Sequence, residues 1–175
     1  MELLMGCGSR REKLIPWNDR TNWDELVTLD INADHKPDVV HDLTVLPLPF
    51  DDDTFDEVHA YEVLEHTGQQ GDWRFFFDQF SEFWRILKPG GVLCGTSPGR
   101  TSPWVWGDPG HTRSLSVETF TFLDQTQYTK QVGVTPMTDY RFVYRADFRP
   151  LVLTPGDRFA FVIEAVKPSR CTLPE

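Results

Sequence analysis

The chain has 175 residues, of which 39% are hydrophobic, and this content is typical of one packed domain, residues 1–175. No apolar run approaches the roughly 20 residues that span a bilayer, so we expect a soluble protein with no membrane partner. The formal net charge of −10 disfavours nucleic acid as a partner, because counterion release rewards positive surfaces.

The cysteines and the first residues indicate a reducing compartment. Cys7, Cys94 and Cys171 are scattered and odd in number, and MELLMGCG lacks the basic start and long apolar stretch of a secretory signal. We therefore expect a cytoplasmic protein. A local basic patch at Arg10, Arg11 and Lys13 is the feature that could still favour a nucleic acid.

The first sixty residues read as short strands separated by turns. Pro16 interrupts the first connection, which therefore holds at most a turn or two of helix. Short apolar runs bounded by polar residues predict strands at 2–5, 26–31, 38–41 and 55–61.

The most regular helix follows these strands. Apolar residues recur at helical spacing from Trp73 to Leu87, Asp72 is suited to the N-cap, and KPGG ends the pattern. Residues 92–96 then read as a buried strand. A strand, a helix and a strand in this order predict parallel pairing through a right-handed crossover, so the fold class is α/β.

The last third of the chain has a different composition and pattern. Residues 97–115 are rich in Pro, Gly and Trp, which favours a long ordered loop, and we interpret it as a substrate loop or lid. A short helix is predicted over 116–123. Alternating residues at 140–148 and 158–167 predict an antiparallel hairpin at the sheet edge.

Two features indicate a nucleoside site. Gly6 and Gly8 directly follow the first strand, where backbone approaches a ligand most closely in an open parallel sheet. Asp30 ends the second strand, where a carboxylate can accept both hydroxyls of a ribose. Arg11 stands where a dinucleotide loop needs glycine, and GxxxxGK[ST] is missing, so an adenosine without pyrophosphate is favoured.

Four successive segments carry a family resemblance. MGCGS, TLDIN, VVHDLTVLPLPFDDDTFDEVHAYEVLEH and ILKPGGVL together resemble the class I S-adenosylmethionine-dependent methyltransferases, close to the type 11 group, over the first hundred residues. The resemblance implies a Rossmann-like methyltransferase fold with a mostly parallel twisted sheet, and S-adenosylmethionine as cofactor. The cofactor-binding residues that it implies are Gly6, Cys7, Gly8, Asp30, Ile31, Asp42, Leu43, Tyr61 and Glu62.

The chain also departs from the family pattern. Leu4 replaces the acidic residue two positions before the first glycine, and Arg10 replaces the third glycine of the loop, where it could narrow the pocket. The family commonly carries helices before the first strand that cover the cofactor. We therefore expect residues 97–113 or a second subunit to close the site, which allows a homodimer.

The candidate catalytic residues follow the fourth predicted strand. His66 is the candidate general base because imidazole titrates near neutral pH, and Glu62 is the second candidate. The alternative is that His66 has only a structural role. Trp104, Trp106 and His111 are candidate substrate contacts, or parts of a lid packed on the core. His111 lacks a convincing set of partner ligands, so we predict no metal.

Three functions remain open on the sequence. The first is methyl transfer to an O, N or C nucleophile of a small-molecule or glycan acceptor, which the acidic composition favours. The second is methylation of RNA or protein; AYEVLEH differs from the Asn or Asp, two prolines and an aromatic residue of amino-methylating DNA enzymes. The third is a non-catalytic module that binds S-adenosylmethionine.

Overall fold

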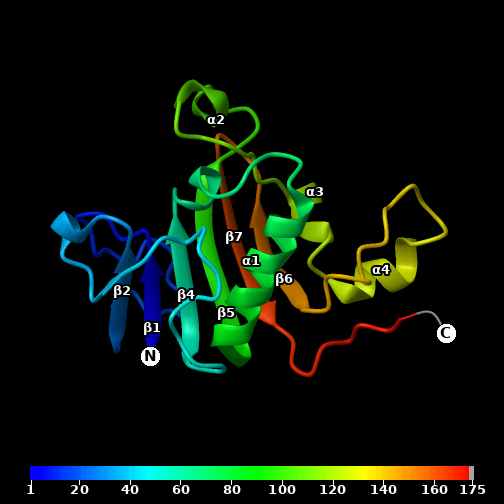
Figure 1. Cartoon of the computed structure of the whole chain (residues 1–175), viewed down its shortest axis with the longest axis horizontal. Helices are drawn as coiled ribbons and strands as arrows, with labels where there is room; N and C mark the ends of the chain where they lie inside the picture. The colour runs from blue at the N-terminus through cyan, green and yellow to red at the C-terminus, as the bar shows by residue number, and fades with distance from the viewer. Residues whose placement is uncertain (174–175) are drawn as a thin grey trace.

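The computed structural model describes residues 1–173 and contains one seven-stranded sheet. The strand order is β3-β2-β1-β4-β5-β7-β6, and Figure 1 shows α1 lying across the sheet. The strands are β1 Glu2–Met5, β2 Leu26–Asp30, β3 Val39–Val40, β4 Phe55–Tyr61, β5 Leu87–Pro98, β6 Phe148–Thr154 and β7 Arg158–Ala165.

Most strands of the sheet run in the same direction. Strands β1 to β5 pair in parallel, whereas β7 pairs antiparallel with both β5 and β6. This confirms the predicted α/β class and the antiparallel C-terminal pair. The carboxyl ends of β1, β2 and β4 therefore share one edge, which is where open α/β sheets bind ligands.

The helices differ greatly in length. They are α1 Trp73–Ile86, α2 Trp104–Gly107, α3 Val117–Thr121 and α4 Gln125–Gln131, with 3-10 turns η1 Ala33–His35 and η2 Leu64–His66. The α1 helix begins as predicted, because Asp72 accepts a hydrogen bond from the Phe75 N–H at 3.1 Å. Within residues 1–173, none of the helices combines the length and apolar character needed to cross a bilayer.

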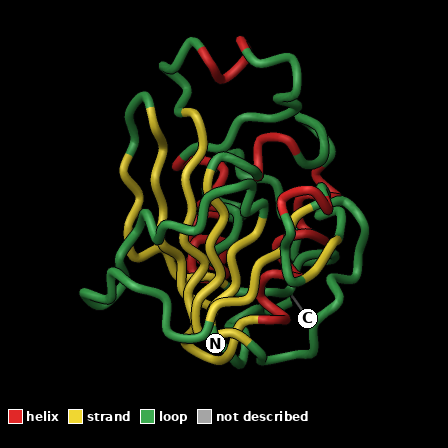
Figure 2. The backbone as a smooth tube through the Cα atoms, turned by 90° about the vertical axis from the view of Figure 1, so that its left-hand side faces the viewer, coloured by secondary structure: helices red, strands yellow, loops and turns green. Residues whose placement is uncertain are grey.

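The two faces of the sheet are covered differently. Phe77, Phe80 and Phe83 of α1 pack into the main core. On the opposite face the connection between β1 and β2 contains no helix, and its Ile15 and Trp17 pack on Val92, Cys94 and Val162. The α2 helix lies in a lobe beyond the strand ends, as the two perpendicular views show (Figure 1, Figure 2).

The structure corrects the predicted elements of the last third. The run 140–148 is not a strand, because Tyr140 and Tyr144 pack on Phe77 of α1 and leave the edge of the sheet to β6. The hairpin partner of β7 therefore begins only at Phe148. The α4 helix was not predicted, and β5 extends beyond the predicted 92–96 at both ends.

Candidate functional site

Three adjoining pockets form a crevice at the carboxyl ends of the strands. The Asp30 pocket has a volume of about 440 Å³, the Cys7 pocket about 410 Å³ and the His111 pocket about 520 Å³. Gly6 and Gly8 line both of the first two, Glu62 lines both of the last two, and His66 lines the Asp30 and His111 pockets. Residues predicted from separate motifs therefore meet in one place.

The glycine loop is shaped by the first of its glycines. Gly6 has a φ of +58°, and a Cβ there would lie 2.3 Å from a methyl group of Val63. Only glycine fits this position, because the backbone here passes directly over the segment that follows β4. This is the close approach that the sequence predicts for a loop that faces a ligand.

Arg11 holds the same loop from outside. Its Nη1 donates to the carbonyls of Cys7 and Gly8, and its Nη2 donates to the carbonyl of His35 at 2.9 Å. Arg10, Arg11 and Lys13 do not form a common basic patch, because Arg11 is occupied by carbonyl oxygens and the Lys13 side chain is fully buried between carboxylates. Arg10 is exposed and lines the Cys7 pocket.

Asp30 joins the glycine loop to the end of β2. Its carboxylate accepts the Gly8 N–H at 2.8 Å and the Asn32 N–H at 2.8 Å, and it lies 3.2 Å from Nδ1 of His35. Burial opposes ionisation, but these donors outweigh it and lower the pKa of Asp30. The carboxylate is therefore charged at neutral pH. Oδ2 accepts only the Gly8 N–H and keeps a further lone pair, whereas Oδ1 already faces Asn32 and His35.

The remaining walls of the Asp30 pocket come from two neighbouring turns. Ile31 is 66% exposed beside Asp30, which leaves an apolar side chain facing the pocket, and Leu43 is buried opposite. One carboxylate oxygen of Asp42 accepts the N–H and hydroxyl of Thr44, each at 2.8 Å. The other oxygen of Asp42 is free of these contacts.

Cys7 and Tyr61 line the Cys7 pocket. Burial raises the pKa of the Cys7 thiol, which makes it a poor nucleophile. The Tyr61 hydroxyl accepts the Ile15 N–H at 3.1 Å and lies 2.6 Å from Nδ1 of His59. Tyr61 is thus next to the pocket as predicted, but its hydroxyl fastens the loop that follows β1.

Glu62 lies between the Cys7 and His111 pockets. It has a φ of +50°, an unusual conformation for a residue with a side chain, and its carboxylate pairs with Arg158 of β7 at 3.3 Å. Such strain concentrates at functional sites. Arg158 lines both pockets as well, and the sequence pattern of β7 did not identify it as a site residue.

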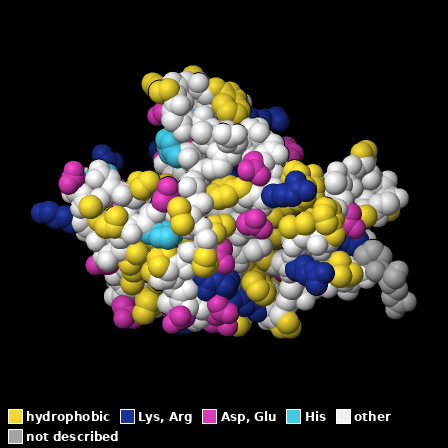
Figure 3. Space-filling view, in the orientation of Figure 1, with side chains coloured by type: hydrophobic (Ala, Val, Ile, Leu, Met, Phe, Trp, Pro, Cys, Tyr) yellow, Lys and Arg dark blue, Asp and Glu magenta, His cyan; other side chains and the backbone are white. Residues whose placement is uncertain are grey.

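The α2 loop, residues 99–113, closes the far side of the His111 pocket. The rings of His66 and His111 lie 4.6 Å apart, and Nδ1 of His111 lies 2.8 Å from the Trp104 carbonyl. Trp104 lines the pocket but Trp106 is not among the lining residues, and both are exposed. Figure 3 shows hydrophobic side chains on the surface of the lobe that contains α2. The structure therefore brings Trp104 and His111 to the site and leaves Trp106 outside it.

Glu65 is a site residue that the sequence did not single out. It is 2% exposed, and neither of its carboxylate oxygens has a hydrogen-bond partner. Burial, together with the charge of Glu62, raises the pKa of Glu65 to about 7. The η2 turn buries Glu65 and leaves Glu62 at the pocket boundary.

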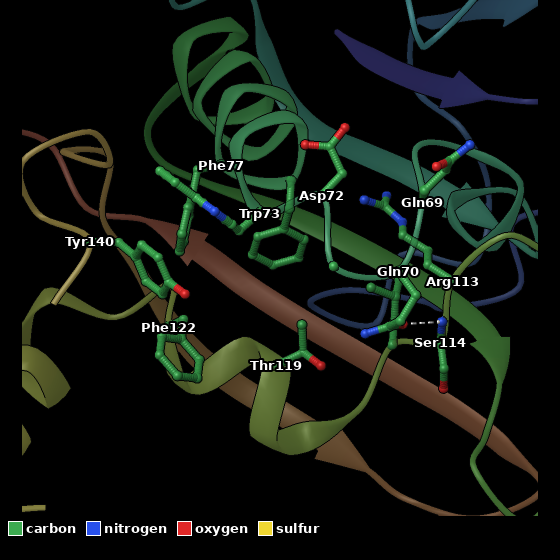
Figure 4. Close-up of a pocket in the computed structure, with 13 residues that line it drawn as sticks. Gln69, Gln70, Asp72, Trp73, Phe77, Arg113, Ser114, Thr119, Phe122 and Tyr140 are labelled. Carbon is green, nitrogen blue, oxygen red and sulfur yellow. Dashed lines mark hydrogen bonds between the residues drawn. The ribbon is translucent and has the colours of Figure 1, made fainter. Parts of the chain in front are cut away.

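A fourth pocket of about 190 Å³ lies apart from the crevice. Figure 4 shows Trp73, Phe77, Phe122 and Tyr140 on one side of it and Gln69, Gln70 and Arg113 on the other. Arg113 is buried, and its guanidinium donates to the Leu64 carbonyl at 2.8 Å. This pocket shares none of its lining residues with the three pockets of the crevice.

The fold and the crevice together define a Rossmann-like domain with a pocket at the carboxyl ends of its strands, where this class of fold binds ligands. Residues 3–95, more than half of the chain, match the sequence profile of the family described as methyltransferase domain. The chain belongs to this family. The family predicted from the sequence is confirmed by this match.

A relative of the chain is described as a probable S-adenosylmethionine-dependent methyltransferase of Mycolicibacterium smegmatis. It is 35% identical over 114 residues, which are 60% of this chain and 40% of the relative. The match thus spans 40% of the length of that relative.

Two solved structures show the same fold. An S-adenosylmethionine-dependent methyltransferase from Archaeoglobus fulgidus has a TM-score of 0.56 at 16% identity, over 93% of this chain and 85% of that one. The N-methyltransferase NodS from Bradyrhizobium japonicum, in complex with S-adenosyl-L-homocysteine, has a TM-score of 0.52 at 19% identity, over 94% and 76%.

Proposed function

We propose that this domain transfers a methyl group from S-adenosylmethionine to an O, N or C nucleophile of a small-molecule or glycan acceptor. The observation that carries the proposal is the continuity of the crevice. Its glycine loop and Asp30 pocket suit a nucleoside, and Glu62 joins them to a second pocket large enough for an acceptor.

The residues of the Asp30 pocket fit the adenosine part of the donor. The free lone pair on Oδ2 of Asp30 suits one ribose hydroxyl, and Oδ1 can accept the second hydroxyl if it replaces the 3.2 Å contact with His35. Ile31 offers an apolar surface for the adenine ring, and the free oxygen of Asp42 can accept from its amino group. The Cys7 pocket, with Glu62 at its end, is left for the methionine part.

The charge of the His111 pocket favours a particular class of acceptor. Glu62, Glu65, Asp108 and Asp157 line it, with Arg158 as the only cation among its lining residues. This excess of carboxylates disfavours a phosphate backbone and favours a neutral or cationic acceptor. Trp104 adds an exposed aromatic face of the kind that packs on sugars or small ring systems.

The protein's main contribution to the reaction is alignment. S-adenosylmethionine supplies a methyl group that is already activated on a sulfonium. Holding the acceptor nucleophile in line behind that methyl group can lower the barrier by roughly 7 to 11 kcal/mol. The strained backbone of Glu62 fixes its carboxylate at the boundary of the two pockets, and the α2 loop forms the outer wall that positions the acceptor.

Calorimetric titration with S-adenosyl-L-homocysteine tests the donor site. Asp30→Ala should weaken binding by about 1.5 to 3 kcal/mol, roughly ten- to 150-fold, because it removes charge-assisted hydrogen bonds to the ribose. Asp30→Asn, which keeps one acceptor oxygen, guards against a folding defect. Asp34→Ala removes an exposed carboxylate outside the pocket linings and serves as the control. Unchanged affinity in both Asp30 variants would remove Asp30 from the donor site.

The acceptor class can be tested by product formation. The domain is incubated with S-adenosylmethionine and panels of amines, hydroxyl compounds, glycans, RNA and protein, and S-adenosyl-L-homocysteine is quantified. We expect turnover with small neutral or cationic acceptors or glycans. Turnover confined to RNA or protein would refute the proposed acceptor class and leave the methyl transfer standing.

A further inference from the structure

A cluster of metal-ligating side chains lies in the wall of the His111 pocket. Glu65, His66 and His111 each offer a ligand atom, and these atoms all lie within 4.8 Å of one another. The prediction of no metal rested on the lack of a convincing ligand set at suitable spacing around His111. Glu65 and His66 stand far from His111 in the chain. The fold brings the three residues together because the α2 loop packs against η2.

Backbone contacts fix the two segments in register. The Thr112 N–H donates to the Glu65 carbonyl at 2.9 Å, and the Arg113 N–H donates to the same carbonyl at 3.3 Å. Gly110 also belongs to this fit, since a Cβ there would lie 3.1 Å from Nδ1 of His66. His111 is therefore held opposite His66 by the main chain and not by a chance side-chain contact.

Both imidazoles are oriented as metal ligands usually are. Nδ1 of His66 lies 3.1 Å from the Gly110 carbonyl, and Nδ1 of His111 lies 2.8 Å from the Trp104 carbonyl. A carbonyl oxygen can only accept, so Nδ1 carries the hydrogen in each ring. Nε2 of each neutral ring is then left with a free lone pair, and a histidine that binds a metal is typically held in this way.

Glu65 supplies an independent observation. Its side chain is almost completely buried, yet both carboxylate oxygens lack a hydrogen-bond partner. A buried polar group without a partner is costly and rare in folded proteins. A cation bound between Glu65 and the two histidines would give those oxygens the partner that the protein does not provide.

We propose that Glu65, His66 and His111 bind a divalent transition-metal cation in the wall of the acceptor pocket. Two imidazole nitrogens and one carboxylate suit Zn²⁺, Mn²⁺, Fe²⁺ or Co²⁺ better than Mg²⁺ or Ca²⁺, which prefer oxygen ligands. Asp108, whose carboxylate lies 3.9 Å from Nε2 of His111, borders the site.

The site would act on the acceptor. Three protein ligands leave coordination positions open to the pocket, where an acceptor oxygen or nitrogen can bind and be oriented. A bound acceptor hydroxyl loses its proton to solvent more readily. Its electron pair then forms the bond to the methyl carbon as the carbon–sulfur bond breaks and leaves the sulfur neutral. His66 thus serves as a ligand instead of a free base; this role rests on the proposed function, whereas the binding of the cation does not.

Metal binding can be measured without donor or acceptor. The metal-free domain is titrated with Co²⁺, whose visible absorption reports nitrogen and oxygen ligands, and then with Zn²⁺ as competitor. We expect one equivalent to bind, and affinity to fall at least tenfold in each of Glu65→Gln, His66→Gln and His111→Gln. His41→Gln, which changes a histidine of the crevice outside the set, should bind Co²⁺ normally.

The outcomes separate this site from the donor site. Circular dichroism establishes that each variant is folded, and titration with S-adenosyl-L-homocysteine reports the donor pocket independently. An absence of stoichiometric Co²⁺ binding, or binding that survives the loss of either histidine, overturns the proposal even where the donor still binds. Normal binding in Glu65→Gln would overturn the role of the carboxylate.

Discussion

The loop between β1 and β2 is fastened to the sheet by a buried charge cluster, and Lys13→Met tests its contribution to stability. Nζ of Lys13 lies 2.6 Å from Glu57 and 3.0 Å from Glu2, and all three side chains are at most 1% exposed. Removing one partner of a buried pair typically costs 3 to 5 kcal/mol, because a charge is left uncompensated. Arg20 still pairs with Glu57, so we expect the lower end, about 3 kcal/mol.

Thermal and denaturant unfolding measure the effect. For a domain of this size a loss of about 3 kcal/mol lowers the midpoint temperature by roughly 6 to 12 °C. Lys88→Met is the matched control, since Lys88 pairs with Asp56 at 2.9 Å but both side chains are more than 40% exposed. The double variant Lys13→Met/Glu57→Gln should recover part of the loss. A loss in Lys13→Met no larger than in Lys88→Met would refute the reasoning.

Two further predictions concern pH and the glycine loop. Burial opposes the charge of Glu57, but hydrogen bonds from His59 and Lys13 outweigh it and lower its pKa to about 2. The stability that Glu57 contributes is complete above about pH 5 and lost as pH falls toward 2, about 3 kcal/mol in all; equilibrium unfolding across this range should show a shallower loss in Glu57→Gln. Gly6→Ala should destabilise more than Gly133→Ala, since both have positive φ but only Gly6 has a side chain, Val63, in the way. Equal losses in the two variants would show that the contact with Val63 carries no cost.

The elements that could be predicted are those with a local cause. The bounds of β1 and β4 follow from short apolar runs, and α1 follows from its helical spacing and the Asp72 cap. The positions of Gly6 and Asp30 follow from the topology, because residues that end adjacent parallel strands must lie together. In each case the information lies within a few residues or in the order of strands.

The features that could not be predicted depend on contacts between distant segments. Glu65 and His111 meet only because Thr112 and Arg113 bond to the backbone of η2. The alternating run from Tyr140 to Phe148 has the period of a strand, yet its tyrosines pack on Phe77 of α1 and not at the sheet edge. The local sequence pattern does not tell which of two apolar surfaces, α1 or the sheet edge, the tyrosines will pack against.

The Lys13 cluster links stability to the proposed site. The polar residues of β4 alternate, which is typical of a solvated face, but here Glu57, His59 and Tyr61 are turned toward the loop that follows β1. Lys13 and the Ile15 N–H bond to that face, and the neighbouring Glu12 and Leu14 line the Cys7 pocket. The connection between β1 and β2 contains no helix, so the buried ion pairs of Lys13 hold this wall of the pocket in place. Lys13→Met should therefore weaken the binding of S-adenosyl-L-homocysteine as well as lower the free energy of unfolding. Lys88→Met should change the binding little and the free energy of unfolding much less.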